Sequence, residues 1–212
     1  YHIINQNISE FKRELRKNPK SKDYQNDKGW TALMIASINS RKYGNNFVRI
    51  LLDKKANINI KNNDGWTALM MACRYSNSES NEETVKILID CGADVNITNN
   101  NGCSALILAS RYSKISSTEY TIKMLIDRGA NLNIKNIFGD TALMIASQNS
   151  NNSSTEETVK ILIDSGANLD LQNINGCTAL MLASRFSGCD SSEKTVKMLI
   201  DEGAKVDSQN KE

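Results

Sequence analysis

The phrase GWTALM, at residues 65–70, decides the fold, because variants of it recur along nearly the whole chain. They read GWTALM at residues 29–34, GCSALI at 102–107, GDTALM at 139–144 and GCTALM at 176–181. The leading glycines are 36 or 37 residues apart, and an asparagine lies three residues before each of them. A second phrase follows later in the unit, such as VKILID at residues 85–90 and 159–164. A fixed period of this length is typical of a repeat solenoid, in which each unit buries its apolar face against its neighbours.

Each unit predicts two short helices. The hydroxyl of Thr67 can accept a hydrogen bond from a free first-turn N–H group, so this residue is expected to cap the first helix. The equivalent residues in the other units are Thr31, Ser104, Thr141 and Thr178. Capping boxes are expected to begin the second helices, at Ser80 with Glu83, Ser116 with Glu119, Ser154 with Glu157 and Asp190 with Glu193. A glycine such as Gly92 is expected to end each second helix in a left-handed conformation, although the first unit has Lys55 there.

These units resemble the ankyrin repeat. The matching phrases are GWTALM at residues 65–70 and GADVN at 92–96, and the resemblance covers residues 26–209. It implies an all-α repeat solenoid of helix–turn–helix units joined by β-hairpin fingers, here with a 36–37-residue period. The family's Pro and His in the first phrase are replaced by Ala and by Met or Ile, so apolar packing is expected where the family has the histidine. The residue pattern of the units also resembles that of ankyrin repeat proteins of mimivirus-type giant viruses of amoebae.

The resemblance suggests how the chain is divided. Five ankyrin repeats are expected at residues 26–61, 62–98, 99–135, 136–172 and 173–209. Residues 1–25 are expected to form a partial repeat that caps the first full one with a charged face. Residues 210–212 are expected to be the truncated start of a further repeat, because the last helix pattern does not become more polar, as a terminal cap usually does.

The composition argues against several classes of function. The 212 residues carry a net charge of +2, without the basic excess of a nucleic-acid-binding surface. The one histidine, His2, nearly excludes histidine catalysis, and no paired carboxylates or metal-ligand spacing is present, so no enzyme activity, cofactor or metal is expected. No apolar run approaches the ~18 residues of a membrane helix. Five cysteines without a framework spacing indicate reduced thiols, and hence an intracellular, cytoplasmic protein, in the host cytoplasm if it is viral.

The resemblance places a partner on the concave side, against the fingers and the first helices. The candidate contact residues there are Trp30, Trp66, Arg74, Tyr75, Arg111, Tyr112, Phe138, Asp140, Arg185 and Phe186. Trp, Tyr and Arg are the residue types most enriched in binding hot spots, and a row of arginines would suit an acidic partner surface. The alternative is a scaffold role, in which each Tyr packs on the adjacent repeat and each Arg stacks on it or pairs with an acidic residue.

Three functions remain open. The leading hypothesis is a non-enzymatic module that binds a protein, for a viral chain a host protein, through the concave face. A second is a structural spacer, or an array that self-associates through the uncapped C-terminal repeat. The third is a substrate-recruiting region of a larger protein, such as a ubiquitin-ligase adaptor, and this rests on analogy of fold alone.

Overall fold

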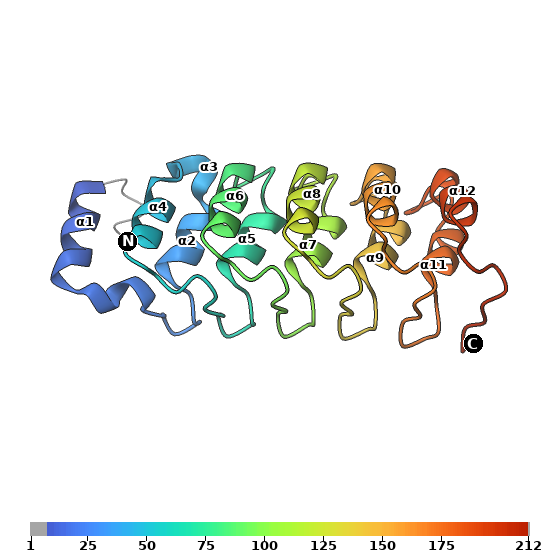
Figure 1. The fold of residues 1–212 in the computed structure, drawn as a ribbon, viewed down its shortest axis with the longest axis horizontal. Coiled ribbons are helices and arrows are strands. Elements are labelled where there is room, and N and C mark those ends of the chain that lie inside the picture. Colours follow the sequence, from blue (N-terminus) through green and yellow to red (C-terminus); the bar gives the residue numbers. More distant parts are fainter. Residues whose placement is uncertain (1–7, 212) are drawn as a thin grey trace.

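The protein is an elongated array of stacked helix pairs with a row of loops along one side (Figure 1). The computed structural model describes residues 8–211, except for the side chains of residues 8, 9, 11 and 12. The N-terminal segment forms α1 (Ile8–Lys17) and a 3-10 helix (Pro19–Asp23). The first helices of the pairs are α2 (Ala32–Ile38), α5 (Ala68–Arg74), α7 (Ala105–Arg111), α9 (Ala142–Gln148) and α11 (Ala179–Arg185). The second helices are α4 (Asn46–Asp53), α6 (Glu82–Asp90), α8 (Glu119–Asp127), α10 (Glu156–Asp164) and α12 (Glu193–Asp201), and the short α3 (Ser40–Tyr43) lies before α4.

The first helices form the centre of the array, and their caps are those that the sequence predicts. The hydroxyl of Thr67 accepts from the backbone N–H of Met70, and the four equivalent residues cap their helices in the same way. Every residue of α5 except Arg74 is buried, because α5 packs between α2 and α7 and also against α6. Met70 and its counterparts Met34, Ile107 and Met144 are almost fully buried, which confirms apolar packing at the position where the family has a histidine.

The second helices begin later than predicted, so the capping boxes read from the sequence are wrong. The observed N-caps are Asn81, Thr118, Thr155 and Ser192, each of which accepts from the backbone N–H three residues on. The predicted ends are confirmed, with φ between 81° and 89° at Gly92, Gly129, Gly166 and Gly203. Lys55 takes the equivalent place with a φ of 57°, a left-handed conformation that costs a residue with a Cβ about 1 kcal/mol.

Buried serines just before the second helices link one repeat to the next, and two of the predicted caps, Ser80 and Ser154, are engaged in this way. Ser117 donates from its hydroxyl to the carbonyl of Cys73 at 2.7 Å, and its Oγ lies 3.4 Å from that of Ser76. Thr121 Oγ1 in turn donates to Ser76 Oγ at 2.8 Å. The same hydroxyl chain recurs between Ser113, Ser154 and Thr158 and between Ser150, Ser191 and Thr195. Buried hydroxyls need partners, and here the partner is the adjacent repeat.

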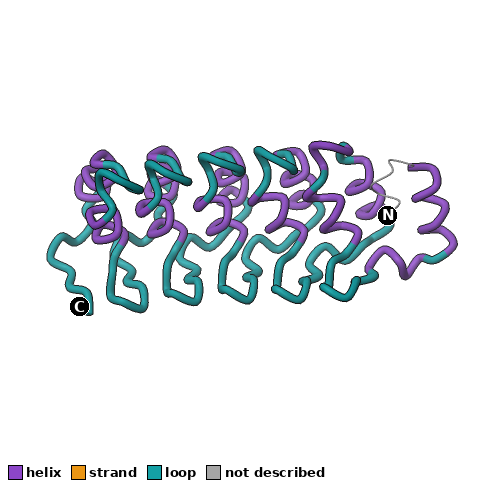
Figure 2. Tube along the Cα trace, turned by 180° about the vertical axis from the view of Figure 1, so that it is seen from behind, coloured by secondary structure: helices purple, strands orange, loops and turns teal. Residues whose placement is uncertain are grey.

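The fingers are loops rather than the β-hairpins that the resemblance implies. Within residues 8–211 no strand forms, and the only ladder-like pairs are two isolated bridges, Thr98 with Ser104 and Ser187 with Ser191 (Figure 2). The reason is that asparagine side chains take the backbone donors that a hairpin would pair. Asn62 Oδ1, for example, accepts from the N–H groups of Asp64 and Trp66 at 3.0 and 2.8 Å.

Neighbouring fingers are held together by backbone and asparagine hydrogen bonds. The N–H of Asn100 donates to the carbonyl of Asp64 at 3.0 Å, and this contact recurs from each finger to the next. At the other end of each loop, Asn59 Oδ1 accepts from Asp94 N at 3.0 Å, and Asn96 Oδ1 accepts from Asn131 N at 2.7 Å. The loops therefore form a continuous ribbon along the array, although they contain no strand.

The two ends of the array differ. At the N-terminal end α1 packs against α4, with Leu15 buried and Arg16 and Lys17 exposed. At the C-terminal end Ile200 is 46% and Val206 73% exposed, whereas their internal counterparts Ile89 and Val95 are buried. Of the described residues, those at the C-terminal end therefore leave more of the repeat's stacking face in solvent.

Candidate functional site

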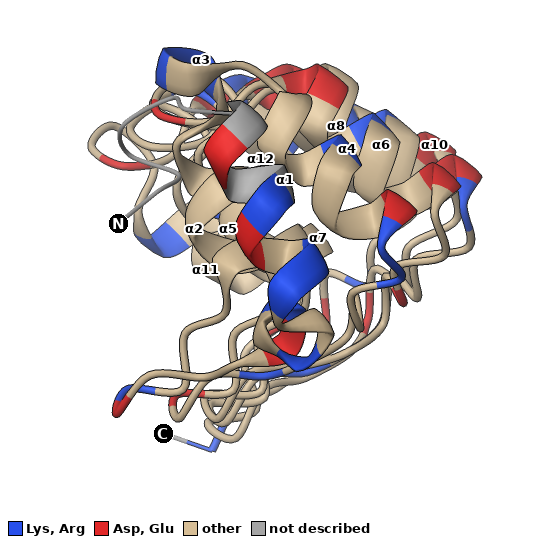
Figure 3. Ribbon diagram, turned by 90° about the vertical axis from the view of Figure 1, so that its left-hand side faces the viewer, with Lys and Arg blue, Asp and Glu red and all other residues tan. Residues whose placement is uncertain are grey.

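The candidate contact residues lie along the side of the array to which the fingers point. Viewed along the array, the fingers extend towards the side of α2, α5 and α11, away from α4, α6, α8 and α10 (Figure 3). The first helices and the fingers thus lie on one side of the array, which we call the concave face. The candidate contact residues belong to the ends of the first helices and to the positions next to the finger glycines.

Arg74 is the centre of an aromatic cluster that spans two repeats. Its guanidinium carbon lies 5.7 Å from the ring centre of Trp66, 5.1 Å from that of Tyr75 and 4.4 Å from that of Tyr112. All four side chains are half-buried. Arg74 Nε is buried and, in the part of the chain that the structure describes, has no hydrogen-bond partner. A cation held over aromatic faces gains roughly 0.5–2 kcal/mol per contact, so Arg74 stabilises the contact between the second and third repeats.

Arg111 and Arg185 have a different environment, because both are exposed. The guanidinium of Arg111 lies 5.7 Å from the ring of Tyr112, and that of Arg185 lies 5.9 Å from the ring of Phe186. The next repeat offers Arg111 no aromatic ring equivalent to Tyr112, since Asn149 stands at that place and bonds the carbonyl of Ile145. The row of Arg-aromatic pairs is therefore interrupted, and these two arginines face solvent.

The remaining candidates lie on the fingers. Trp30 and Trp66 are half-buried and pack on the core with part of each ring exposed. Asp140 is half-buried and accepts from the side-chain amide of Asn173 at 2.9 Å. Phe138, at a finger tip, is 57% exposed. The structure thus joins Trp66, Arg74, Tyr75 and Tyr112 in one cluster and leaves Trp30, Phe138 and the Arg185–Phe186 pair apart from it.

Arg111, Cys103 and Asp140 share one electrostatic environment at the base of the third and fourth fingers. Burial raises the pKa of the Cys103 thiol, and the negative charge of Asp140 raises it further, while the positive charge of Arg111 lowers it. The charged groups are thus close enough to affect the thiol.

Two exposed residues were not selected from the sequence. Ile137 and Ile174, at the tips of adjacent fingers, are 55% and 54% exposed. The sequence does contain a signal for them, because the first three fingers have the polar residues Asp27, Asn63 and Asn100 at the same position.

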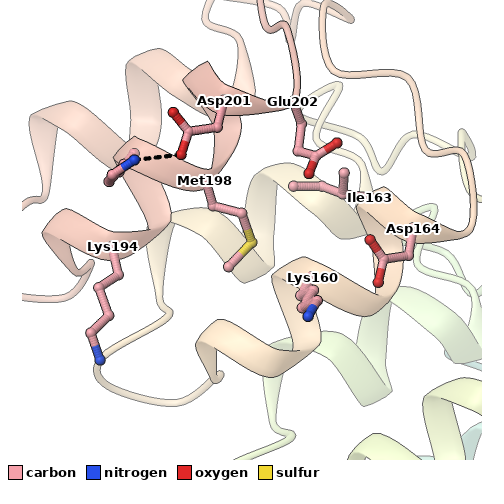
Figure 4. A pocket seen from close by; sticks show the side chains of 8 residues that line it. Lys160, Ile163, Asp164, Lys194, Met198, Asp201 and Glu202 are labelled. Carbon is pink, nitrogen blue, oxygen red and sulfur yellow. Dashed lines mark hydrogen bonds and ion pairs between the residues drawn. The ribbon is translucent and has the colours of Figure 1, made fainter.

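Outside the concave side, a shallow pocket of about 300 Å³ lies between α10 and α12 (Figure 4). Met198 and Ile163 line it together with charged side chains, among them Lys160, Asp164 and Glu202. Lys197 donates to Asp201 across one turn at 2.6 Å. Charged side chains of both signs around its rim distinguish this pocket from the apolar clefts that hold small ligands.

Residues 8–211 include no group of three side chains placed to hold a metal ion. All five cysteines are free thiols, and burial raises the pKa of the Cys73 thiol. No helix in the described part of the chain is both long and apolar enough to cross a bilayer.

Comparison with known families accounts for the repeated helix pairs. The family described as Ankyrin repeats (3 copies) matches residues 2–99, 42–136, 76–173 and 114–210, which together span almost the whole sequence. The chain belongs to the ankyrin repeat family. Ankyrin repeats are generally protein–protein interaction modules, and the family is typically non-enzymatic. No curated protein matches the chain.

Proposed function

We propose that this ankyrin repeat protein binds a protein partner through its concave face, and that Arg111 and Arg185 make the central polar contacts. The observation that carries the proposal is the exposure of these two arginines beside the half-buried rings of Tyr112 and Phe186. Arg74 is assigned to the scaffold, because its guanidinium is already used between rings of the same chain. Tyrosine, tryptophan and arginine are enriched in binding hot spots, and aromatic rings offer large contact areas.

The chemistry of the two arginines favours an acidic partner surface. A guanidinium binds a carboxylate through two parallel hydrogen bonds, so a partner with Asp or Glu spaced like Arg111 and Arg185 would be recognised. The likeness of the repeated phrases to giant-virus ankyrin proteins makes a host protein the candidate partner, in the host cytoplasm. The five free thiols are in keeping with a reducing compartment.

The proposal includes the division of the chain. The packing of α1 on α4 supports a capping role for residues 1–25, ahead of five repeats in 26–209. Lys211 N donates to the carbonyl of Asn175 at 3.0 Å, as the equivalent residues of internal fingers do, so Lys211 continues the row of finger contacts.

Reversing the charge of the two arginines tests the binding proposal. In affinity capture from an amoebal cytosolic lysate, Arg111→Glu with Arg185→Glu is expected to lower recovery of the captured protein at least tenfold, because a hot-spot contact contributes about 2 kcal/mol or more. The matched control, Lys123→Glu with Lys160→Glu, makes the same charge change at exposed positions on the outer helices. Both double variants are expected to keep the melting temperature of the wild type, since exposed substitutions change stability little. Equal loss of capture in both variants would show that net charge, and not the concave face, governs binding.

A second candidate function is self-association through the C-terminal end. Leu180, Met181, Ile200 and Val206 line a hollow of about 440 Å³ there, together with Ser184, Lys205 and Ser208. Apolar surface of this kind is covered inside the array and exposed at this end. A second copy of the chain could cover it.

Charged residues at the exposed end test self-association. Ile200→Glu with Val206→Glu is expected to convert a concentration-dependent dimer into a monomer in sedimentation equilibrium, because burying two carboxylates opposes the contact. Tyr120→Glu, on the outer face of α8 where the ring is also exposed, is the control and should leave the dimer intact. A wild-type protein that stays monomeric at every concentration removes this candidate.

A further inference from the structure

Three exposed apolar side chains form one patch on the tips of the fourth and fifth fingers. We call Ile137, Phe138 and Ile174 the tip patch, and each is between 54% and 57% exposed. The two fingers are in direct contact, because Ile174 N donates to the carbonyl of Phe138 at 3.1 Å. The first three fingers have only polar residues at the corresponding positions, namely Asp27, Lys28, Asn63, Asp64, Asn100 and Asn101. The apolar surface is thus confined to one part of the finger row.

The isoleucines replace side chains that hold the other fingers together. Asn63 Nδ2 donates to the carbonyl of Asp27 at 2.9 Å, and Asn100 Nδ2 donates to the carbonyl of Asn63 at 2.9 Å. Ile137 and Ile174 stand at the same position and have no amide. The carbonyls of Asn100 and Ile137 therefore lack the side-chain donor that their counterparts have.

The change from asparagine to isoleucine at these two positions adds no contact that would stabilise the fold. The backbone contact between fingers is unchanged, with Ile137 N donating to Asn101 O at 3.0 Å, so the isoleucines are not needed to form it. Their side chains stay more than half exposed, so they do not enlarge the core. Two consecutive fingers thus lose the asparagine that bonds the preceding finger, and no other contact among the described residues replaces it. Such a departure from the locally favourable residue is expected at a functional site.

Two lysines lie near the tip patch, and the acidic residue of the fourth finger, Asp140, is half-buried and accepts from the side-chain amide of Asn173. Lys135 and Lys211 are exposed and lie in the fourth finger and in the segment that contacts the fifth. Residues 134–139 and 171–176, which form the tips of the two fingers, contain no acidic residue. By contrast, Asp27 and Asp64 accompany Lys28 and Lys61 on the first two fingers.

We propose that the tip patch is the docking point for a partner segment that carries an apolar side chain flanked by acidic residues. The apolar side chain packs on Ile137, Phe138 and Ile174, backbone N–H groups of the segment donate to the carbonyls of Asn100 and Ile137, and the flanking carboxylates face Lys135 and Lys211. This inference rests on the proposed binding function and narrows it, because it names the class of segment and the part of the finger row that it occupies.

The variant that tests the tip patch restores the pattern of the other fingers. Ile137→Asn with Ile174→Asn replaces two exposed apolar side chains with the residue that bonds the preceding finger at Asn63 and Asn100. We expect this double variant to melt at or above the temperature of the wild type, so loss of binding cannot be attributed to unfolding. Ile115→Asn is the matched control, because Ile115 is 58% exposed in the loop between α7 and α8, away from the fingers.

The binding experiment uses a displayed library of random peptides selected on the immobilised wild-type protein. The selected peptides are expected to share an apolar residue with flanking Asp or Glu, and synthetic copies are measured by fluorescence anisotropy. Affinity should fall at least tenfold for the double Asn variant and stay unchanged for Ile115→Asn. Peptides that bind the double Asn variant as tightly as the wild type but lose affinity for Arg111→Glu with Arg185→Glu would overturn the tip-patch inference and support the proposed function. A library from which no peptide is enriched over the bare support counts against both.

Discussion

Gly65→Ala is expected to destabilise the protein by about 3 kcal/mol or more, because two separate costs coincide at this finger. Gly65 has a φ of +81°, where a residue with a Cβ is strained. The added Cβ would also lie 2.7 Å from the backbone nitrogen of Asn100 and 2.9 Å from the Cα of Asn99. That backbone cannot move away freely, since Asn100 N is bonded to the carbonyl of Asp64. Urea unfolding followed by circular dichroism measures the loss.

Gly92→Ala separates the two costs. Gly92 has a φ of +89°, but a Cβ placed on it would have no heavy atom within 4 Å. Only the strain of the left-handed conformation applies, about 1–2 kcal/mol. The difference between the two variants therefore measures the close approach of neighbouring fingers. Equal destabilisation would mean that the fingers can move apart, and that they do not hold the array together.

The period and the first-helix caps could be predicted because they depend on residues close in sequence. A threonine and the N–H group three residues later lie in the same turn, as at Thr67 and Met70. The second-helix caps could not be predicted, because Ser80 and Asn81 are both residue types that cap helices. The Ser80 hydroxyl instead lies 3.2 Å from that of Ser40, a residue 40 positions away in the sequence.

The sequence places the candidate residues at equivalent positions in the repeats, but it does not separate the contacts that each of them makes. Arg74, Arg111 and Arg185 occupy equivalent places, so the sequence treats them alike. What separates them is the residue one repeat further on. Tyr112 provides a ring for Arg74, and Asn149 provides none for Arg111. The environment of a side chain in a stacked array depends on the next unit, so equal motifs do not imply equal contacts.

The same dependence on neighbours predicts a large effect of Leu106→Ala in the middle of the array. Leu106 lies on α7, which packs between α5 and α9, and its side chain is fully buried. Truncating such a residue costs about 2–5 kcal/mol, from lost burial and from the cavity. We expect a loss near the middle of that range in urea unfolding.

Leu180→Ala is the matched control, because Leu180 holds the equivalent place on α11, the last of the first helices, and is 8% exposed. Among the described helices, α11 has a first-helix neighbour on one side only, α9. The structure around the cavity can therefore relax, and the loss of unfolding free energy should be clearly smaller.

Each repeat contacts only its neighbours, so the destabilisation caused by Leu106→Ala should be local at first. Hydrogen exchange is expected to accelerate most in α5, α7 and α9, and least in α2. Uniform acceleration along the chain would contradict this, and would show that the repeats unfold as one cooperative unit with the stability of each shared by all.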